Sequence, residues 1–120
     1  FLHLLVPAIM RLTEDKATPI SVRKKALQTL ARLCFRMHLA DYASTIILPL
    51  VRLLRSEPKL RSECMQLLSG LVNQLGMEYA NFEPLVRSVM RKNGIEHPVY
   101  SAILKNIIFK QQQRAATYLM

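Results

Sequence analysis

Apolar residues recur along this chain at the spacing of an α-helix, in stretches separated by short polar breaks. In one stretch they advance in steps of three, four or one residue and so share one side of a helix: Val22, Ala26, Leu27, Leu30, Leu33, Cys34 and Met37. Lys25, Arg32 and Arg36 fall together on another side, where we expect them to face water. The periodicity predicts an all-α fold with helices over about 2–12, 19–37, 41–55, 56–75, 79–92 and 98–113.

A longer period is superimposed on the helical one, because one two-helix pattern occurs three times. In each copy an apolar helix with a proline precedes a polar break and a second helix rich in apolar residues. Pro49 follows Pro7 by 42 residues, and Arg61 follows Arg23 by 38 residues. Self-similarity at this period predicts an α-solenoid of HEAT or armadillo type. We expect about three antiparallel helix pairs in a right-handed superhelical stack.

The three copies divide the chain into repeats but not into domains. The repeats cover about 1–37, 41–75 and 79–113, and no stretch rich in Pro, Gly or Ser separates them. We therefore expect a single domain of 120 residues. The chain starts at Phe1 without an initiator Met or a signal-peptide pattern, and we interpret it as a piece of a much longer protein. The uncharged stretch Tyr42–Val51 is far shorter than the roughly 20 residues of a membrane span.

Prolines and small polar residues predict where the helices bend and end. A proline recurs in the first helix of each copy, where its missing N–H predicts a shared kink: Pro7, Pro49 and Pro84. N-caps are expected at Thr18, Asp41 and Ser56. Gly76 stands where a left-handed residue commonly ends a helix. From Gln111 to Met120 the last helix either continues or frays.

Acidic and basic residues near the break within each copy suggest a structural role. Asp15 and Arg23 flank the break of copy one, and Glu57 and Arg61 hold the matching places in copy two. We expect stacked repeats to join these groups in a ladder of charge-assisted hydrogen bonds. Copy three departs from this pattern, with Lys92 and Tyr100 in the corresponding positions.

The formal net charge of +9 comes from scattered basic groups as well as from three clusters, at residues 23–25, 87–92 and 105–114. Binding of nucleic acid would require basic residues on one surface, with aromatic rings between them for stacking. We expect the neighbouring aromatic residues, including Phe35 and Phe109, to be mostly buried. The charge therefore favours a solvated face that meets acidic partners over a nucleic-acid site.

No catalytic, cofactor or metal site is predicted. His3, His38 and His97 are far apart, and none pairs with Cys34 or Cys64 at the spacing of zinc ligands. The three glycines form no phosphate-binding loop. The two cysteines fall among core positions in different helices, so we expect free thiols and a reducing compartment.

Several short runs carry a more specific resemblance. The runs Leu4–Pro7 and Val22–Leu27 resemble the HEAT-repeat pattern. Leu2–Ile9, Asp41–Ser44, Pro58–Ser62 and Gln74–Gly76 resemble the HEAT-repeat region of the target-of-rapamycin (TOR) kinases, a group within the phosphatidylinositol-kinase-related family. The resemblance extends over most of the chain and thins after about Tyr100.

This resemblance implies a scaffold segment of a giant serine/threonine kinase, with the kinase domain elsewhere. It implies a cytoplasmic, nutrient-responsive growth-control complex, also at the lysosome or vacuole surface. The implied partners are neighbouring HEAT repeats, a second TOR protomer and a Raptor-type subunit, and the residues that contact them stay unknown. No catalytic or rapamycin-binding residue carries over to this chain. Two alternatives remain: a HEAT-repeat transport, adaptor or phosphatase-scaffold protein, and a basic helical-repeat protein that binds nucleic acid.

Overall fold

A computed structural model describes residues 1–119, without the side chains at 111, 115 and 117–119. Its elements, in chain order, are α1 (Leu2–Glu14), α2 (Ile20–Arg36), η1 (Ala40–Tyr42), α3 (Ala43–Ser56), η2 (Pro58–Leu60), α4 (Arg61–Leu75), η3 (Gly76–Asn81), α5 (Glu83–Lys92) and α6 (Pro98–Leu119), where η marks a 3₁₀ turn. The described residues contain six α-helices and no strand, so the predicted all-α fold is confirmed. The last helix continues to Leu119, well past the expected end near Gln113.

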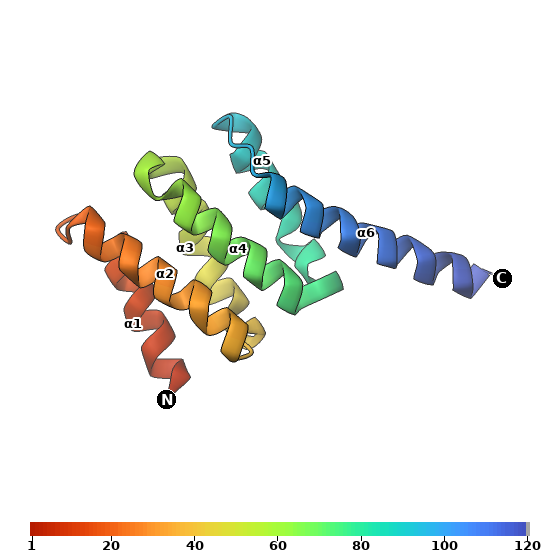
Figure 1. Cartoon of the computed structure of the whole chain (residues 1–120), viewed down its shortest axis with the longest axis horizontal. Helices are drawn as coiled ribbons and strands as arrows, with labels where there is room; N and C mark the ends of the chain where they lie inside the picture. Colours follow the sequence, from red (N-terminus) through yellow and green to blue (C-terminus); the bar gives the residue numbers. More distant parts are fainter. Residues whose placement is uncertain (120) are drawn as a thin grey trace.

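The six helices form three consecutive pairs that lie side by side in two layers (Figure 1). Helices α2, α4 and α6 form one layer, in which α4 packs on both neighbours. Helices α1, α3 and α5 form the other layer, in which α3 occupies the middle. The turns within the three pairs lie along one edge, and the connections between pairs lie along the opposite edge (Figure 1). The molecule is elongated and thin, with extents of 56, 36 and 18 Å.

One continuous hydrophobic core runs between the two layers. Every helix contributes apolar residues to it, and the middle pair contributes most because it has a neighbour on each side. Fully buried positions include Leu27, Leu30, Ile46, Leu50, Leu67, Leu68 and Val86. Helices α2 and α4 approach closely at Gly70, where an added Cβ would lie 3.3 Å from Cys34 Cβ. A residue without a side chain at this position lets the two helices pack directly.

The prolines behave differently in the three pairs. Pro7 lies inside α1 and Pro49 inside α3, so the carbonyls of His3 and Thr45 cannot receive the usual helical hydrogen bond from four residues ahead. Pro84 is the second residue of α5, a position whose N–H has no helical partner in any case. The expectation of a shared internal proline is therefore wrong for the third pair.

None of the three expected N-caps forms. Thr18 lies at the end of the turn that follows α1 and donates from Oγ1 to Asp15 Oδ2 at 3.0 Å, while Pro19 is the residue that precedes α2, without a side-chain cap. Asp41 lies inside η1, and Tyr42 precedes α3. Ser56 is the last residue of α3 and donates to the Arg52 carbonyl. Because 3₁₀ turns lead directly into α3 and α4, those helices start later than their polar residues suggest.

Gly76 does have the positive φ expected at the end of α4, although its φ of 57° and ψ of −126° lie outside the left-handed helical region. A residue with a side chain would be strained there. Gly76 therefore ends α4 by a different turn from the one predicted.

Burial differs from the helical pattern mainly at the ends of the stack. Val22, Met37 and Leu12 are more than a third exposed although they fall on apolar stripes. Phe35 is 85 % exposed and Phe109 is 56 % exposed, so the expected burial of these aromatic rings is wrong. Conversely, Thr13, Arg23 and Tyr79 are buried. Periodicity identifies a helical face but not the neighbour that covers it.

The two cysteines give a test of the core. Burial raises the pKa of Cys34 to about 11 and that of Cys64 to about 12, and both are free thiols. Since thiolate is the reactive form, a thiol-specific disulfide reagent at mildly alkaline pH should modify both residues only as fast as the chain unfolds. The urea-unfolded chain is the control and should react at once. Rapid labelling of either folded thiol would contradict this burial.

The raised pKa values of the two thiols make the free energy of unfolding depend on pH. The folded thiols bind their protons more tightly than unfolded thiols, whose pKa is about 9. This contribution is fully present below pH 9 and is lost as the pH rises from about 9 to about 12. Replacing both cysteines by alanine should make the decline in unfolding free energy over this range shallower.

Candidate interaction surfaces

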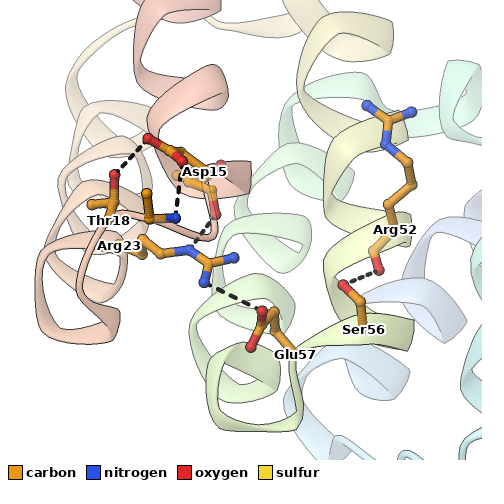
Figure 2. A network of polar contacts seen from close by, with 8 residues as sticks. Asp15, Thr18, Arg23, Arg52, Ser56 and Glu57 are labelled. Atoms are coloured by element: carbon orange, nitrogen blue, oxygen red, sulfur yellow. Dashed lines mark hydrogen bonds and ion pairs between the residues drawn. The ribbon is translucent and has the colours of Figure 1, made fainter.

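Arg23 joins the first two helix pairs at the edge that carries the turns. Its guanidinium is almost fully buried and donates from Nε to the Thr13 carbonyl at 2.7 Å, near the end of α1. It also donates from Nη1 to Glu57 Oε1 at 3.3 Å, in the turn of the second pair (Figure 2). One side chain thus binds a helix end in its own pair and an acidic group in the next pair.

Arg61 makes the corresponding contacts one pair further on. Its Nε donates to the Leu54 carbonyl near the end of α3 at 2.9 Å, and its Nη2 donates to Asn93 Oδ1 at 3.4 Å. Asn93 follows α5 as Glu57 follows α3. In both cases the arginine of one pair donates a hydrogen bond to the residue that follows the first helix of the next pair. That residue is the acidic Glu57 for Arg23 and the neutral amide Asn93 for Arg61.

The expected ladder between stacked copies forms in part, because Arg23 binds Glu57 of the following copy whereas Asp15 takes no part in it. Asp15 does not contact Arg23; its carboxylate accepts hydrogen bonds from Ala17 N and Thr18 Oγ1 in its own turn, each at 3.0 Å (Figure 2). Glu57 pairs with Arg23 of the preceding copy and not with Arg61. The arginine contacts run from each pair to the next, as expected of a ladder between stacked copies, but residue spacing alone does not reveal which partner each arginine binds.

A second connection between pairs escaped the sequence analysis. Gln74 of α4 donates from Nε2 to the carbonyls of Cys34 and Met37 and accepts from Leu39 N at 2.7 Å. One amide thus satisfies three backbone groups in the connection between α2 and η1. Residue spacing does not predict these contacts of Gln74, because its partners lie 35 to 40 residues away in the sequence.

Helices α1 and α3 are also bridged at the surface. Arg52 donates from Nε and Nη2 to the two carboxylate oxygens of Glu14 at 2.8 and 3.0 Å. These hydrogen bonds hold the pKa of Glu14 below its usual value. The pair is exposed, so water and salt screen it, and we expect it to add little stability.

An open cleft of about 360 Å³ lies between α5, the loop after it and the start of α6. Its lining includes Glu83, Arg87, Met90, Ile95 and Leu104. A second hollow of about 190 Å³ continues past η3 and shares Glu83, Arg87 and Leu104 with the first. The third pair is therefore less closely packed than the first two, in line with its irregular sequence.

Two buried tyrosines connect this cleft to the core. The hydroxyls of Tyr79 and Tyr100 are 2.7 Å apart and share a hydrogen bond. Burial raises the pKa of both hydroxyls, so they stay protonated at neutral pH. Their rings meet edge to face at a centroid distance of 6.3 Å. This geometry anchors η3 to α6 and offers no general base or nucleophile.

Within residues 1–119 no group of His, Cys, Asp and Glu side chains could hold a metal ion. Tyr100 N donates to His97 Nδ1, whereas no hydrogen bond or ion pair involves the side chains of His3 and His38 in this part of the chain. No described helix has the length and apolar character needed to cross a membrane.

Comparison with known proteins gives consistent matches. The chain is 38 % identical over 109 residues to serine/threonine-protein kinase tor1 of Schizosaccharomyces pombe, covering 90 % of this chain and 5 % of that protein. It is 37 % identical over 107 residues to serine/threonine-protein kinase mTor of Drosophila melanogaster, covering 89 % of this chain and 4 % of that protein. For serine/threonine-protein kinase TOR2 of Saccharomyces cerevisiae the identity is 33 % over 107 residues, with 88 % and 4 % covered. No protein-family model matches the chain.

The arginine contacts predict a graded loss of stability. Arg23→Ala should lower the free energy of unfolding by about 2–4 kcal/mol, because the Thr13 carbonyl and Glu57 lose their partner in a poorly solvated place. Arg61→Ala should cost about 1–2 kcal/mol, since its second partner is neutral. Arg52→Ala, the exposed control, should cost less than about 1 kcal/mol. Urea unfolding measures all three, and equal losses for Arg23 and Arg52 would contradict the assignment.

The tyrosine pair predicts a non-additive effect. Tyr100→Phe leaves the Tyr79 hydroxyl buried without its partner and should cost about 1–3 kcal/mol. Replacing both tyrosines by phenylalanine should cost less than the sum of the single replacements, because no hydroxyl is then left unpaired. Additive losses in urea unfolding would show that the two hydroxyls are not coupled.

Proposed function

Because the chain is homologous to a short part of the TOR serine/threonine kinases along nine-tenths of its own length, we propose that it is a scaffold segment of a TOR-like kinase. One observation carries this proposal. The matched segment, which is only 4–5 % of the length of each relative, folds here as three stacked helix pairs. A unit of this kind presents surface for other proteins and needs no catalytic group of its own. Phosphotransfer belongs to another part of such a protein.

In this proposal the three pairs are HEAT-type repeats of a longer right-handed α-solenoid. Support comes from the two-layer arrangement, in which each pair contacts mainly its neighbours along the stack. It also comes from α1, which carries a second apolar stripe opposite its buried one. Phe1 and Leu4 are 88 % and 69 % exposed, and Leu12 lies on the same stripe. A preceding helix pair would cover this stripe as α3 is covered by α1.

The proposed role is to support assembly of a cytoplasmic, nutrient-responsive complex, acting in part at the lysosome or vacuole surface. A second TOR protomer and a Raptor-type subunit are the proposed partners, reached through the continuous array. The homologues favour this role over a transport, adaptor or phosphatase scaffold, because each is a protein kinase by name.

One experiment tests the identity of the parent protein. An antibody raised against this chain should capture, from its source cells, a polypeptide many times longer than 120 residues that phosphorylates serine or threonine. A captured protein without kinase activity, or one of transport or adaptor type, would overturn the proposal.

A second experiment tests the scaffold role in that full-length kinase. Leu4→Glu with Leu12→Glu places charge on the exposed stripe of α1 and should reduce co-purification of the second protomer and of the Raptor-type subunit by about tenfold. Phosphorylation of a short peptide should change less than about twofold, since no reacting group lies here. Arg11→Glu on the same helix is the matched control and should leave assembly intact. Loss of peptide phosphorylation with intact assembly would contradict a scaffold role.

A further inference from the structure

Charge is divided unequally between the two helix layers. Neither α2 nor α6 contains a carboxylate, and the only acidic residue of the layer formed by α2, α4 and α6 is the half-buried Glu63. Basic side chains are exposed on the two outer helices of this layer: Lys25, Arg32, Arg36, Lys105 and Lys110. We call the outward side of these three helices the basic face.

The exposed cations of the basic face have no carboxylate partner in the described residues, whereas two arginines of the other layer do. On α3 and α5, Arg52 pairs with Glu14 and Arg87 pairs with Glu83. In the part of the chain that the structure describes, no ion pair involves Lys25, Arg32 or Lys105. Their mutual repulsion is therefore not offset within the fold, and an anionic partner would relieve it.

Two exposed aromatic rings lie among these cations. Phe35 is 85 % exposed and lies between Arg32 and Arg36 in the sequence of α2. Phe109 is 56 % exposed and follows Lys105 by four residues in α6, so the two lie on the same side of the helix. Each is the most exposed aromatic residue of its helix among the described side chains. Large rings in these positions offer apolar contacts to a molecule that the cations attract.

Helix α4 separates the two basic helices and supplies a neutral surface. Its exposed residues Ser62, Gln66 and Asn73 recur at helical spacing on one side. Carboxamide groups both donate and accept hydrogen bonds, and so can pair with the N–H and C=O groups of a peptide backbone. A phosphodiester backbone offers acceptors only, which makes this strip a better match for a polypeptide than for a nucleic acid.

We propose that the basic face binds an acidic peptide segment of a partner protein, with its carboxylates on the cations of α2 and α6 and apolar side chains against Phe35 and Phe109. This inference rests on the proposed scaffold function and names the chemistry of one partner. Helix axes packed about 8–10 Å apart place α2 and α6 roughly 20 Å from each other. An extended segment of about six to ten residues, at roughly 3.3 Å per residue, spans that distance.

Binding can be measured on the chain of 120 residues, with circular dichroism to verify that each variant is folded. The probe is a fluorescein-labelled peptide of about ten residues that alternates glutamate with leucine, followed by fluorescence anisotropy. We expect saturable binding that weakens with added salt and is absent for the same peptide with glutamine in place of glutamate. Equal binding of the glutamine peptide would overturn the proposal.

Two sets of variants with the same change in net charge locate the site. Lys25→Glu, Arg32→Glu and Lys105→Glu together should weaken binding of the probe by about tenfold or more. Arg11→Glu, Arg55→Glu and Lys92→Glu, which are exposed on α1, α3 and α5, should weaken it by less than about threefold. Equal weakening by both sets would show attraction by net charge alone and would overturn a defined face.

Phe35→Ala should weaken binding without changing its dependence on salt, and an unchanged affinity would remove the ring from the site.

A labelled thymidine oligonucleotide tests whether the basic face binds nucleic acid instead of an acidic peptide. If it binds more tightly than the acidic peptide and is lost in the same variants, the face is a nucleic-acid site and the proposal is wrong. These results do not depend on the parent protein, because they use the chain alone. If the antibody-capture experiment fails and peptide binding succeeds, only the proposed parent protein is wrong. If capture succeeds and peptide binding fails, only the proposed binding face is wrong.

Discussion

The structure depends on one constraint: two antiparallel helices cannot bury all of their apolar surface against each other. Each pair here covers the remaining surface with the next pair, and α4 shows the result most clearly, with Leu67, Leu68, Leu71 and Val72 fully buried between neighbours. The stack then has two long faces, two edges and two ends. The middle pair has a neighbour on each side, whereas α1 and α6 at the ends keep large apolar side chains exposed, among them Leu4 and Phe109. The distribution of exposed residues follows from this architecture.

Polar contacts specify how successive pairs meet. Arg23 and Arg61 each bind a carbonyl near the end of a helix in their own pair and a side chain that follows the corresponding helix of the next pair. Gln74 does the same at the opposite edge by binding the connection after α2. Burying a guanidinium is unfavourable unless its hydrogen bonds are made, so Arg23 penalises any other register of the first two pairs. Apolar packing supplies the driving force, and these contacts supply the alignment.

The same architecture also gives the two faces different charged and apolar side chains. Two arginines of the layer formed by α1, α3 and α5 pair with carboxylates, whereas the exposed cations of α2 and α6 form no ion pair in the described residues and have two exposed rings beside them. The stack therefore offers surface, and no group of His, Cys, Asp and Glu among the described residues could hold a metal ion. The loosely packed cleft between α5 and α6 is a further surface, and its tyrosine pair keeps it attached to the core.

The amino-acid sequence alone determined the number and approximate position of the helices and the relation to TOR kinases, because helical periodicity and residue identity are local properties. It also indicated Arg23, Glu57 and Arg61 as structurally related positions. Only the tertiary structure decided that Arg23 binds the acid of the following pair while Asp15 binds its own turn, because partners 34 residues apart are selected by packing. For the same reason the exposure of Phe35 and Phe109 could not be predicted. An apolar position is buried only where a neighbour covers it, and the stack leaves the outward side of α2 and α6 uncovered.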